Sequence, residues 1–270
     1  MSEKTEVGRS LQYLIPSRAI QTGRIEEKRD KILNWLAEET FTTSKVLERL
    51  LGLKKNAVHK TLIAMQRVGM VDVHEVSYLD MRFRFIALTS HGAALVGRVG
   101  THYQPGRIAE SIIAHQLDVQ MVRMQAEEIG WTGWICERAL RVAAEQEKRT
   151  TTEPERLWLK VPDAVGSPPG QGAVAIEIER TIKTLKTYEV IVGQYLQMVK
   201  RGAVERVVYL TRTERIADAL GATFNRIQTV PIGGKRFELS PEHHARFSFY
   251  AMSSASDWAG ARQLTNVADT

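Results

Sequence analysis

The sequence contains a single cysteine, Cys136, which excludes a disulfide framework and a zinc finger built on cysteine pairs. It also lacks any apolar run near the roughly 20 residues that a membrane span needs. Its first residues, MSEKTEVGRS, are too polar and too mixed in charge for a signal peptide. These absences predict a cytoplasmic protein without a membrane partner.

Several catalytic signatures are absent as well. The sequence has no glycine-rich phosphate loop of the Walker type, which argues against an NTPase, and no Gly-x-Ser-x-Gly motif. The close histidine pair, His243 and His244, is adjacent, so in a strand the two rings would point to opposite faces. We therefore do not expect this pair to form a metal site.

The positive charge is concentrated in the first part of the chain. With 270 residues, the sequence suits two domains of ordinary size. Residues 1–100 hold 16 Lys and Arg against 11 Asp and Glu, whereas the remaining 170 residues hold 21 against 20. A basic module beside a nearly neutral one fits a nucleic-acid-binding domain attached to a second domain.

The first 100 residues predict a flexible arm and then a small helical domain. Residues 1–24 show no clear period, and helical spacing begins with the stripe of Ile25, Ile32 and Leu36. Two further helices are expected over 42–52 and 53–69, because each ends at a glycine. Two short strands, VDVHEV and RFRFIAL, follow.

This order, with the phrase GMVDVHE…FRFIALTSHGAALV, resembles a winged helix-turn-helix domain over 25–100. The resemblance implies that the third helix enters the major groove of duplex DNA and that the hairpin is the wing. The residues it assigns to DNA contact are Lys55, Asn56, His59, Lys60 and Arg67 on the helix and Arg82 and Arg84 on the wing. A merely solvated face, or a winged helix that binds protein, is the alternative.

A second domain is expected over 107–252, followed by a disordered tail over 253–270. Its pattern predicts a helix over 108–130, then strands in 131–142, 157–165 and 173–180 with a polar loop over 143–155. A helix over 181–202, a strand over 205–211, a short helix and a last strand over 225–234 complete it.

Three acidic residues interrupt two of these strands. Asp163 ends the apolar run LWLKVPD, and Glu177 and Glu179 alternate with apolar residues in AVAIEIER. Residues two apart in a strand face the same way, so the carboxylates repel one another unless a cation lies between them. Such hard oxygen ligands select Mg²⁺ or Mn²⁺. The alternative is a solvated edge strand that carries charge.

The order of elements and the spacing of the acids resemble the core of the PD-(D/E)xK nuclease superfamily. Pro162-Asp163 is followed after 13 residues by Glu177-Ile178-Glu179. We therefore expect an α+β protein, in which a winged helix precedes a restriction-endonuclease-like α/β domain. The resemblance implies that Asp163, Glu177 and Glu179 bind the metal and catalyse cleavage of a phosphodiester.

Glu179 stands where the superfamily usually has lysine. The resemblance implies that Lys183 or Lys186, at the start of the next helix, replaces that lysine. It also assigns auxiliary catalytic roles to His115 on the long helix and to Glu137 on the first strand. Tyr188 and Tyr195 share a helix face and are expected to pack against the sheet or touch DNA rather than act as nucleophiles.

A narrower resemblance covers most of residues 25–232. The series PDAV, AIEIERT, a lysine and a Y…QY helix is similar to the replication-relaxation family, which includes MobC-type plasmid mobilisation relaxases. It implies an endonuclease that nicks DNA at a transfer or replication origin, with accessory relaxosome proteins as further partners and a homo-oligomer left open. The alternative is a catalytically inactive DNA-binding accessory or regulatory protein.

Overall fold

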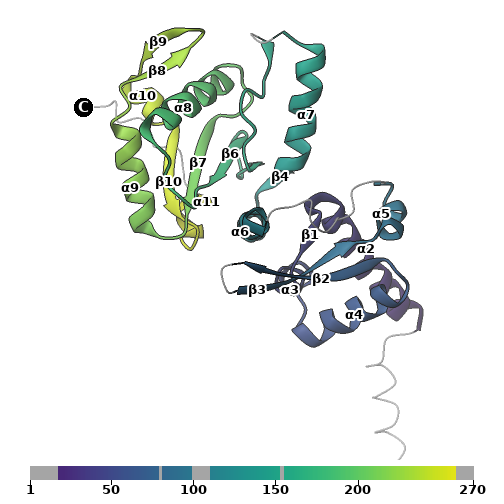
Figure 1. The fold of residues 1–270 in the computed structure, drawn as a ribbon. Coiled ribbons are helices and arrows are strands. Elements are labelled where there is room, and N and C mark those ends of the chain that lie inside the picture. The colour runs from purple at the N-terminus through teal and green to yellow at the C-terminus, as the bar shows by residue number, and fades with distance from the viewer. Residues whose placement is uncertain (1–17, 79–80, 99–109, 153–154, 260–270) are drawn as a thin grey trace, which may run out of the picture. The chain divides into compact units, whose positions relative to one another are not determined.

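A computed structural model describes residues 18–78, 81–98, 110–152 and 155–259 (Figure 1). The chain forms two compact units, Met1–Ile108 and Ala109–Thr270. Both units combine helices with strands, so the chain is a mixed α+β protein, as the sequence predicted.

In its described part, the first unit combines four helices with a small antiparallel sheet. The helices are α2 (Arg18–Glu39), α3 (Ser44–Leu51), α4 (Lys55–Arg67) and α5 (Ser90–Leu95). The strands β1 (Phe41–Thr42), β2 (Val71–Tyr78) and β3 (Met81–Leu88) form the sheet in the order β1-β3-β2. Apolar side chains at helical spacing in α2 and α4, such as Ile32, Leu36 and Met65, are buried with Phe85 of β3.

Local chemistry fixes the turns of this unit. The side chain of Thr43 accepts the hydrogen bond of the Val46 N–H and so begins α3, which ends at Gly52 in the left-handed conformation. A Cβ at Gly92 would lie 1.9 Å from the carbonyl oxygen of Met70. Only glycine therefore allows α5 to pack this closely on the chain that enters β2.

The predicted arm over 1–24 is wrong in its last residues. Helix α2 begins at Arg18, so residues 18–24 are helical, and residues 1–17 lie outside the described residues. The side chains over 22–27 are exposed, so no apolar period marks these first turns in the sequence.

The second unit is built on a five-stranded mixed sheet in the order β10-β7-β6-β5-β4. Its strands are β4 (Thr132–Cys136), β5 (Ala164–Ser167), β6 (Val174–Ile178), β7 (Arg206–Thr211) and β10 (Phe247–Ala251). The pairs β4–β5 and β5–β6 are antiparallel, whereas β6–β7 and β7–β10 are parallel. A separate hairpin joins β8 (Thr229–Ile232) to β9 (Lys235–Glu238).

Helices cover both faces of this sheet. The six helices of the described part are α6 (Glu110–Glu128), α7 (Glu137–Thr150), α8 (Leu185–Lys200), α9 (Glu214–Asn225), α10 (Pro241–His244) and α11 (Ala255–Ala259). In β7, Val207 and Tyr209 pack with α8 and α9, whereas Val208 and Leu210 pack with α6 and α11. The strand is therefore apolar at every inner position, as expected for a strand buried on both faces.

Three predictions for this unit are wrong. The polar loop over 143–155 is mostly helix α7, whose Leu140 and Ala144 are buried one turn apart. Strand β5 begins only at Ala164, so the run LWLKVPD before it is irregular. The expected last strand over 225–234 contributes β8 to the hairpin, and β10 takes the place at the edge of the sheet.

The predicted disordered tail over 253–270 is also wrong in part. Residues Ala255–Ala259 form α11, and Trp258 is buried in the apolar cluster with Trp131 and Ile178. Residues 260–270 lie outside the described residues. A short polar helix anchored by one aromatic residue gives too weak a period to be read from sequence.

Candidate functional site

The predicted acids meet where β5 begins and β6 ends. Ala164 pairs with Ile176, so the antiparallel register places Asp163 opposite Glu177. Oδ2 of Asp163 accepts a hydrogen bond from the Ile178 N–H at 2.7 Å, which ties the two strands together at this point. Glu179 follows directly after β6, and its N–H donates to the carbonyl of Leu210.

Glu177 is a buried carboxylate with two donors on one oxygen. Its Oε1 accepts hydrogen bonds from Nζ of Lys160 and from the hydroxyl of Tyr195. Only 8% of the surface of Glu177 is exposed to solvent. Burial raises the pKa of Glu177 to about 7 against the opposing charge of Lys160, and the negative charge of Asp163 adds to the rise.

Glu179 repeats this arrangement at the next position on the same face. Its Oε2 accepts from Nζ of Lys183 and from the hydroxyl of Tyr188, the latter at 3.0 Å. The backbone N–H of Lys183 in turn donates to the Tyr188 oxygen at 3.1 Å. Each acid is thus held by one lysine and one tyrosine.

The two tyrosines come from one face of α8. Seven residues separate them, which is two helical turns, and both are fully buried. Burial raises the pKa of both hydroxyls, so Tyr188 and Tyr195 stay protonated as hydrogen-bond donors. The sequence prediction that they pack against the sheet is confirmed, but their contacts with the acids were not foreseen.

The third acid, Asp163, is paired with His115. Nε2 of His115 lies 3.1 Å from Oδ1 of Asp163. Burial acts to lower the pKa of His115, but the hydrogen bond and charge of Asp163 outweigh it, so the pKa is raised. The charge of Glu137 contributes to the same rise. His115 therefore carries a proton at a higher pH than an ordinary histidine.

Two arginines that the sequence analysis did not consider lie near this site. Nε of Arg180 and Nη2 of Arg212 are 3.7 and 4.0 Å from Oδ2 of Asp118. Arg180 follows Glu179 and Arg212 follows β7, so both arise at the end of the parallel strands. Burial raises the pKa of Asp118, although both arginines oppose the rise. This end of the sheet presents positive charge as well as acids.

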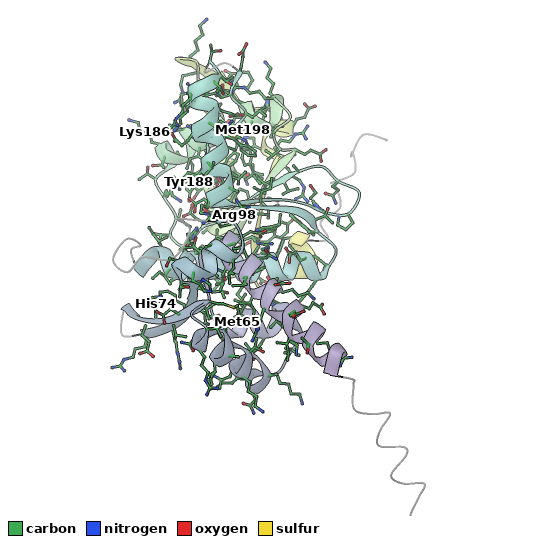
Figure 2. All side chains as sticks on the ribbon, turned by 90° about the vertical axis from the view of Figure 1, so that its right-hand side faces the viewer. Met65, His74, Arg98, Lys186, Tyr188 and Met198 are labelled. Carbon is green, nitrogen blue, oxygen red and sulfur yellow. The ribbon has the colours of Figure 1, made fainter. Side chains whose placement is uncertain are left out.

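The structure separates the two lysines that were proposed as replacements. Lys183 contacts Glu179, whereas Lys186 is exposed on α8 and forms no ion pair or hydrogen bond with another described residue. Figure 2 labels both Lys186 and the buried Tyr188. Lys160 was missed altogether. The signal for it was a lysine within the apolar run LWLKVPD, three residues before Asp163.

The prediction that Glu137 lies on the first strand is wrong. Glu137 is the first residue of α7, directly after β4 ends at Cys136, and its carboxylate pairs with Arg141 one turn later. Its effect on the site is the contribution of its charge to the pKa of His115. An acid in the first helical turn also favours the helix through its dipole.

The carboxylates provide the chemistry of an Mg²⁺ or Mn²⁺ site, but each has its own cation. Asp163 pairs with His115, Glu177 with Lys160 and Glu179 with Lys183. Within the described ranges, no group of three or more His, Cys, Asp or Glu is arranged so that it could hold a metal ion. Carboxylate oxygens are nevertheless the ligands that Mg²⁺ or Mn²⁺ prefers. The metal therefore stays a prediction.

The first unit holds the predicted nucleic-acid surface. All seven predicted DNA-contact residues are exposed, whereas Val58, Leu62 and Met65 turn the opposite face of α4 inward. A hollow of about 240 Å³ lies between α4 and the sheet. Its lining includes Lys55, Asn56, His59 and Arg84. Lys60 and Arg67 lie further along α4, and Arg82 lies on β3.

Comparison of the chain with protein-family models, curated proteins and solved structures gives no match. The resemblance to the replication-relaxation family therefore stays a prediction. In the part of the chain that the structure describes, no helix has both the length and the apolar character of a membrane span.

Proposed function

We propose that this chain is a divalent-metal-dependent endonuclease that nicks one strand of duplex DNA, with a relaxase-like role in the mobilisation of a plasmid or other mobile element. The observation that carries the proposal is the meeting of Asp163, Glu177 and Glu179 with Lys160 and Lys183 at one end of two adjacent strands. Buried carboxylates beside lysines, at the end of a sheet, suit the cleavage of a charged ester.

The topology of the second unit supports a PD-(D/E)xK nuclease fold. Helix α6 precedes the antiparallel strands β4, β5 and β6, and α8 then connects β6 to the parallel strand β7. This is the α-β-β-β-α-β order that the resemblance implies. Helix α7 and the segment from α9 to α11 would be additions to that core.

We assign to Lys160 the role of the motif lysine, whose usual position in the superfamily is occupied here by Glu179. Lys160 contacts Glu177 directly, and its ammonium can stabilise negative charge that develops on a scissile phosphate. Lys183 occupies the equivalent position at Glu179. A divalent cation held by Asp163 and Glu177 would act as a Lewis acid and lower the pKa of a bound water.

The first unit would select the DNA. Its order of three helices and an antiparallel hairpin supports a winged helix, and α4 exposes Asn56, His59 and Lys60 on one side. Asparagine and histidine can read base edges, while lysine and arginine beside them hold phosphates. Arg82 and Arg84 on β3 would contact the backbone as a wing.

Incubation with supercoiled plasmid that carries the gene's own flanking sequences tests this proposal. We expect conversion to open circles with Mg²⁺ or Mn²⁺ and none with EDTA. Glu177→Gln should abolish nicking and retain DNA binding, because it removes a carboxylate and keeps the shape. Glu189→Gln is the matched control, because it changes a carboxylate of helix α8 that pairs with Arg236 of β9 and does not contact the three acids. Nicking by the Glu177→Gln variant at the wild-type rate would refute the assignment.

A catalytically inactive DNA-binding accessory protein is the second candidate. One specific observation favours it, because each of the three acids already has a basic partner within the chain. Such pairs offset the charges without a metal. Specific binding to the flanking DNA without cleavage in either metal would support this reading.

A further inference from the structure

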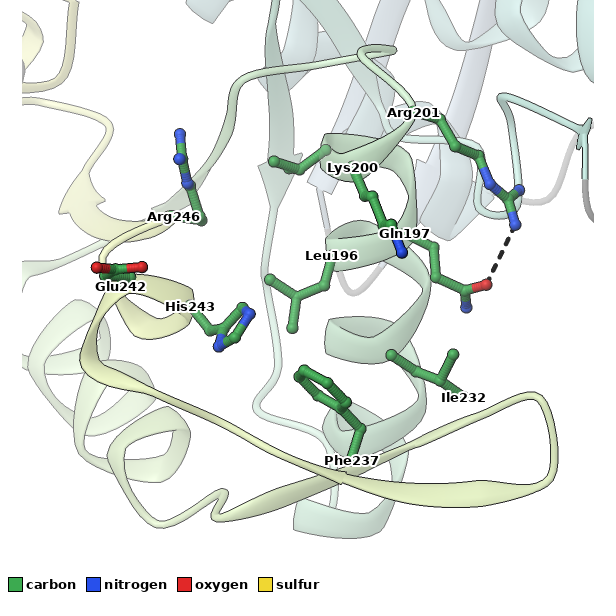
Figure 3. A pocket seen from close by; sticks show the side chains of 10 residues that line it. Leu196, Gln197, Lys200, Arg201, Ile232, Phe237, Glu242, His243 and Arg246 are labelled. Carbon is green, nitrogen blue, oxygen red and sulfur yellow. Dashed lines mark hydrogen bonds between the residues drawn. The ribbon is translucent and has the colours of Figure 1, made fainter.

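A cavity of about 630 Å³ lies far from the acids in the second unit. It is bounded by the C-terminal half of α8, the β8–β9 hairpin and α10 (Figure 3). Helix α8 begins beside the acids and ends at Lys200, before the chain turns back into β7 at Arg206. Because β6 and β7 are parallel, this cavity lies at the opposite end of the sheet. Its volume is in the range of small-molecule sites, about 300–1,000 Å³.

One side of the cavity is apolar. Leu196 and Val199 of α8 face Ile232 and Phe237 of the hairpin. Phe237 is 44% exposed, and its ring lies 5.3 Å from that of His243 in an edge-to-face arrangement. Figure 3 shows both rings turned toward Leu196. An uncovered aromatic ring at such a place can stack on a planar, apolar partner.

The lining also contains basic residues. Nη1 of Arg201 donates to the carbonyl of Arg156 and Nη2 to Gln197, so this guanidinium is already held. The guanidinium of Arg246 makes one hydrogen bond to another described residue, from Nη1 to the carbonyl of Glu205 at 3.3 Å, which leaves other donors available. Lys200 forms no ion pair or hydrogen bond with another described residue. Figure 3 shows Lys200 and Arg246 on opposite sides of Leu196, so each cation can bind an anion separately.

His243 adds a donor of defined direction. Its Nδ1 accepts a hydrogen bond from the Ser240 backbone N–H at 3.0 Å. Since a backbone N–H can only donate, the proton of the neutral ring is on Nε2. Glu242 also lines the cavity, and its carboxylate can only accept hydrogen bonds, such as those from hydroxyl or amine groups. The lining thus offers a stacking surface, anion donors and one acceptor.

We propose that this cavity binds a nucleotide, with its base on Phe237, its phosphate at Lys200, and a sugar hydroxyl or base amine at Glu242. A free nucleotide and a nucleotide within a DNA strand share this chemistry. The inference is independent of the nuclease proposal, because none of the lining residues belongs to the acid site.

Isothermal titration of the full chain tests this site with adenosine 5′-monophosphate, adenosine, inorganic phosphate and a short oligodeoxyadenylate. We expect the monophosphate or the oligonucleotide to bind at least about tenfold more tightly than adenosine or phosphate alone, since only they engage both Phe237 and Lys200. The tighter of the two identifies the source of the nucleotide. Equal affinity for the nucleotide and its separate parts would overturn the proposal.

Matched variants locate the binding. Lys200→Ala and Phe237→Ala should each weaken nucleotide affinity about tenfold or more. Lys235→Ala, an exposed lysine of the same hairpin outside the lining, should not change it. Both test residues are exposed, so the variants should melt like the wild type. Wild-type affinity in both would overturn the proposal. Glu177→Gln should keep nucleotide binding, which separates failure here from failure of the nuclease assignment.

Discussion

The hydroxyl of Tyr195 and the ammonium of Lys160 donate to the same carboxylate oxygen, Oε1 of Glu177. One donor comes from helix α8 and the other from the irregular segment before β5. The acid is therefore fixed by two elements that are far apart in the sequence. Buried polar groups that are satisfied in this way hold a single conformation, which a reactive carboxylate requires.

Tyr195→Phe should lower the free energy of unfolding by about 1–3 kcal/mol, because it removes a donor from a buried carboxylate. Tyr209→Phe is the matched control, since its hydroxyl is buried and has no hydrogen-bond partner among the described residues. That change should cost less than about 0.5 kcal/mol or even stabilise the protein. Urea denaturation of both variants measures the difference, and equal losses would contradict the hydrogen bond to Glu177.

Glu177 should make the wild type less stable as the pH rises. Its pKa is raised from 4.5 to about 7 in the folded protein, so between these values the folded state keeps a proton that the unfolded state has released. This contribution to the unfolding free energy is present below about pH 4.5 and lost as the pH rises through 7.

Glu177→Gln removes this titration, so the stability of the variant relative to the wild type should increase from pH 4.5 to 8. The expected change is on the order of 3 kcal/mol. Chemical denaturation at a series of pH values in EDTA measures it. The rise in the pKa of His115 acts on both proteins and cancels in the comparison. A difference that stays constant across this range would show that Glu177 has an ordinary pKa.

The three lysines near the acids should affect nicking unequally. Under the proposed nuclease function, Lys160→Ala and Lys183→Ala should each reduce the rate by at least about 100-fold, because each removes a cation that contacts one of the three acids. Lys186→Ala should nick normally, since that side chain is exposed on α8 without contact to the acids. Single-turnover assays on supercoiled plasmid compare them. A strong defect in Lys186→Ala alone would reverse the assignment.

Lys60→Ala and Arg67→Ala should weaken duplex binding and flatten its dependence on salt. Each phosphate contact that is lost should reduce the slope of log K against log salt by about 0.9. Lys148→Ala is the control, because this lysine lies in the second unit and pairs with Glu145. Fluorescence anisotropy at several salt concentrations measures the slopes. Unchanged slopes in both test variants would exclude α4 from the DNA contact.

The sequence predicted the grouping of the acids better than the structure of the segments around them. Acids two residues apart in a strand share a face whatever the rest of the fold does, so Glu177 and Glu179 could be paired without a structure. His115 also lies beside Asp163, although 48 residues separate them in sequence. That contact depends on how α6 packs across the sheet. The sequence predicted the helix that carries His115, but not the direction in which it packs.

The failures concern segments whose structure is set by packing rather than by local pattern. Lys160 contacts Glu177 from a segment without regular structure, so no periodicity assigns it a direction. Strand β10 is only five residues long, FSFYA, and pairs with β7 across some 40 residues of sequence. Helix α7 was hidden because its polar residues outnumber the two buried ones.

The late position of β10 in the chain has a consequence for biosynthesis. Every strand that carries or flanks the acids has been synthesised once the ribosome reaches residue 211. Strand β7 nevertheless lacks its outer neighbour, β10, until residues 247–251 are added. During that interval the apolar strand RVVYLT presents unpaired N–H and carbonyl groups to other nascent or misfolded chains. Variants that stop before Phe247 should therefore accumulate as insoluble aggregates and not as a shorter folded protein.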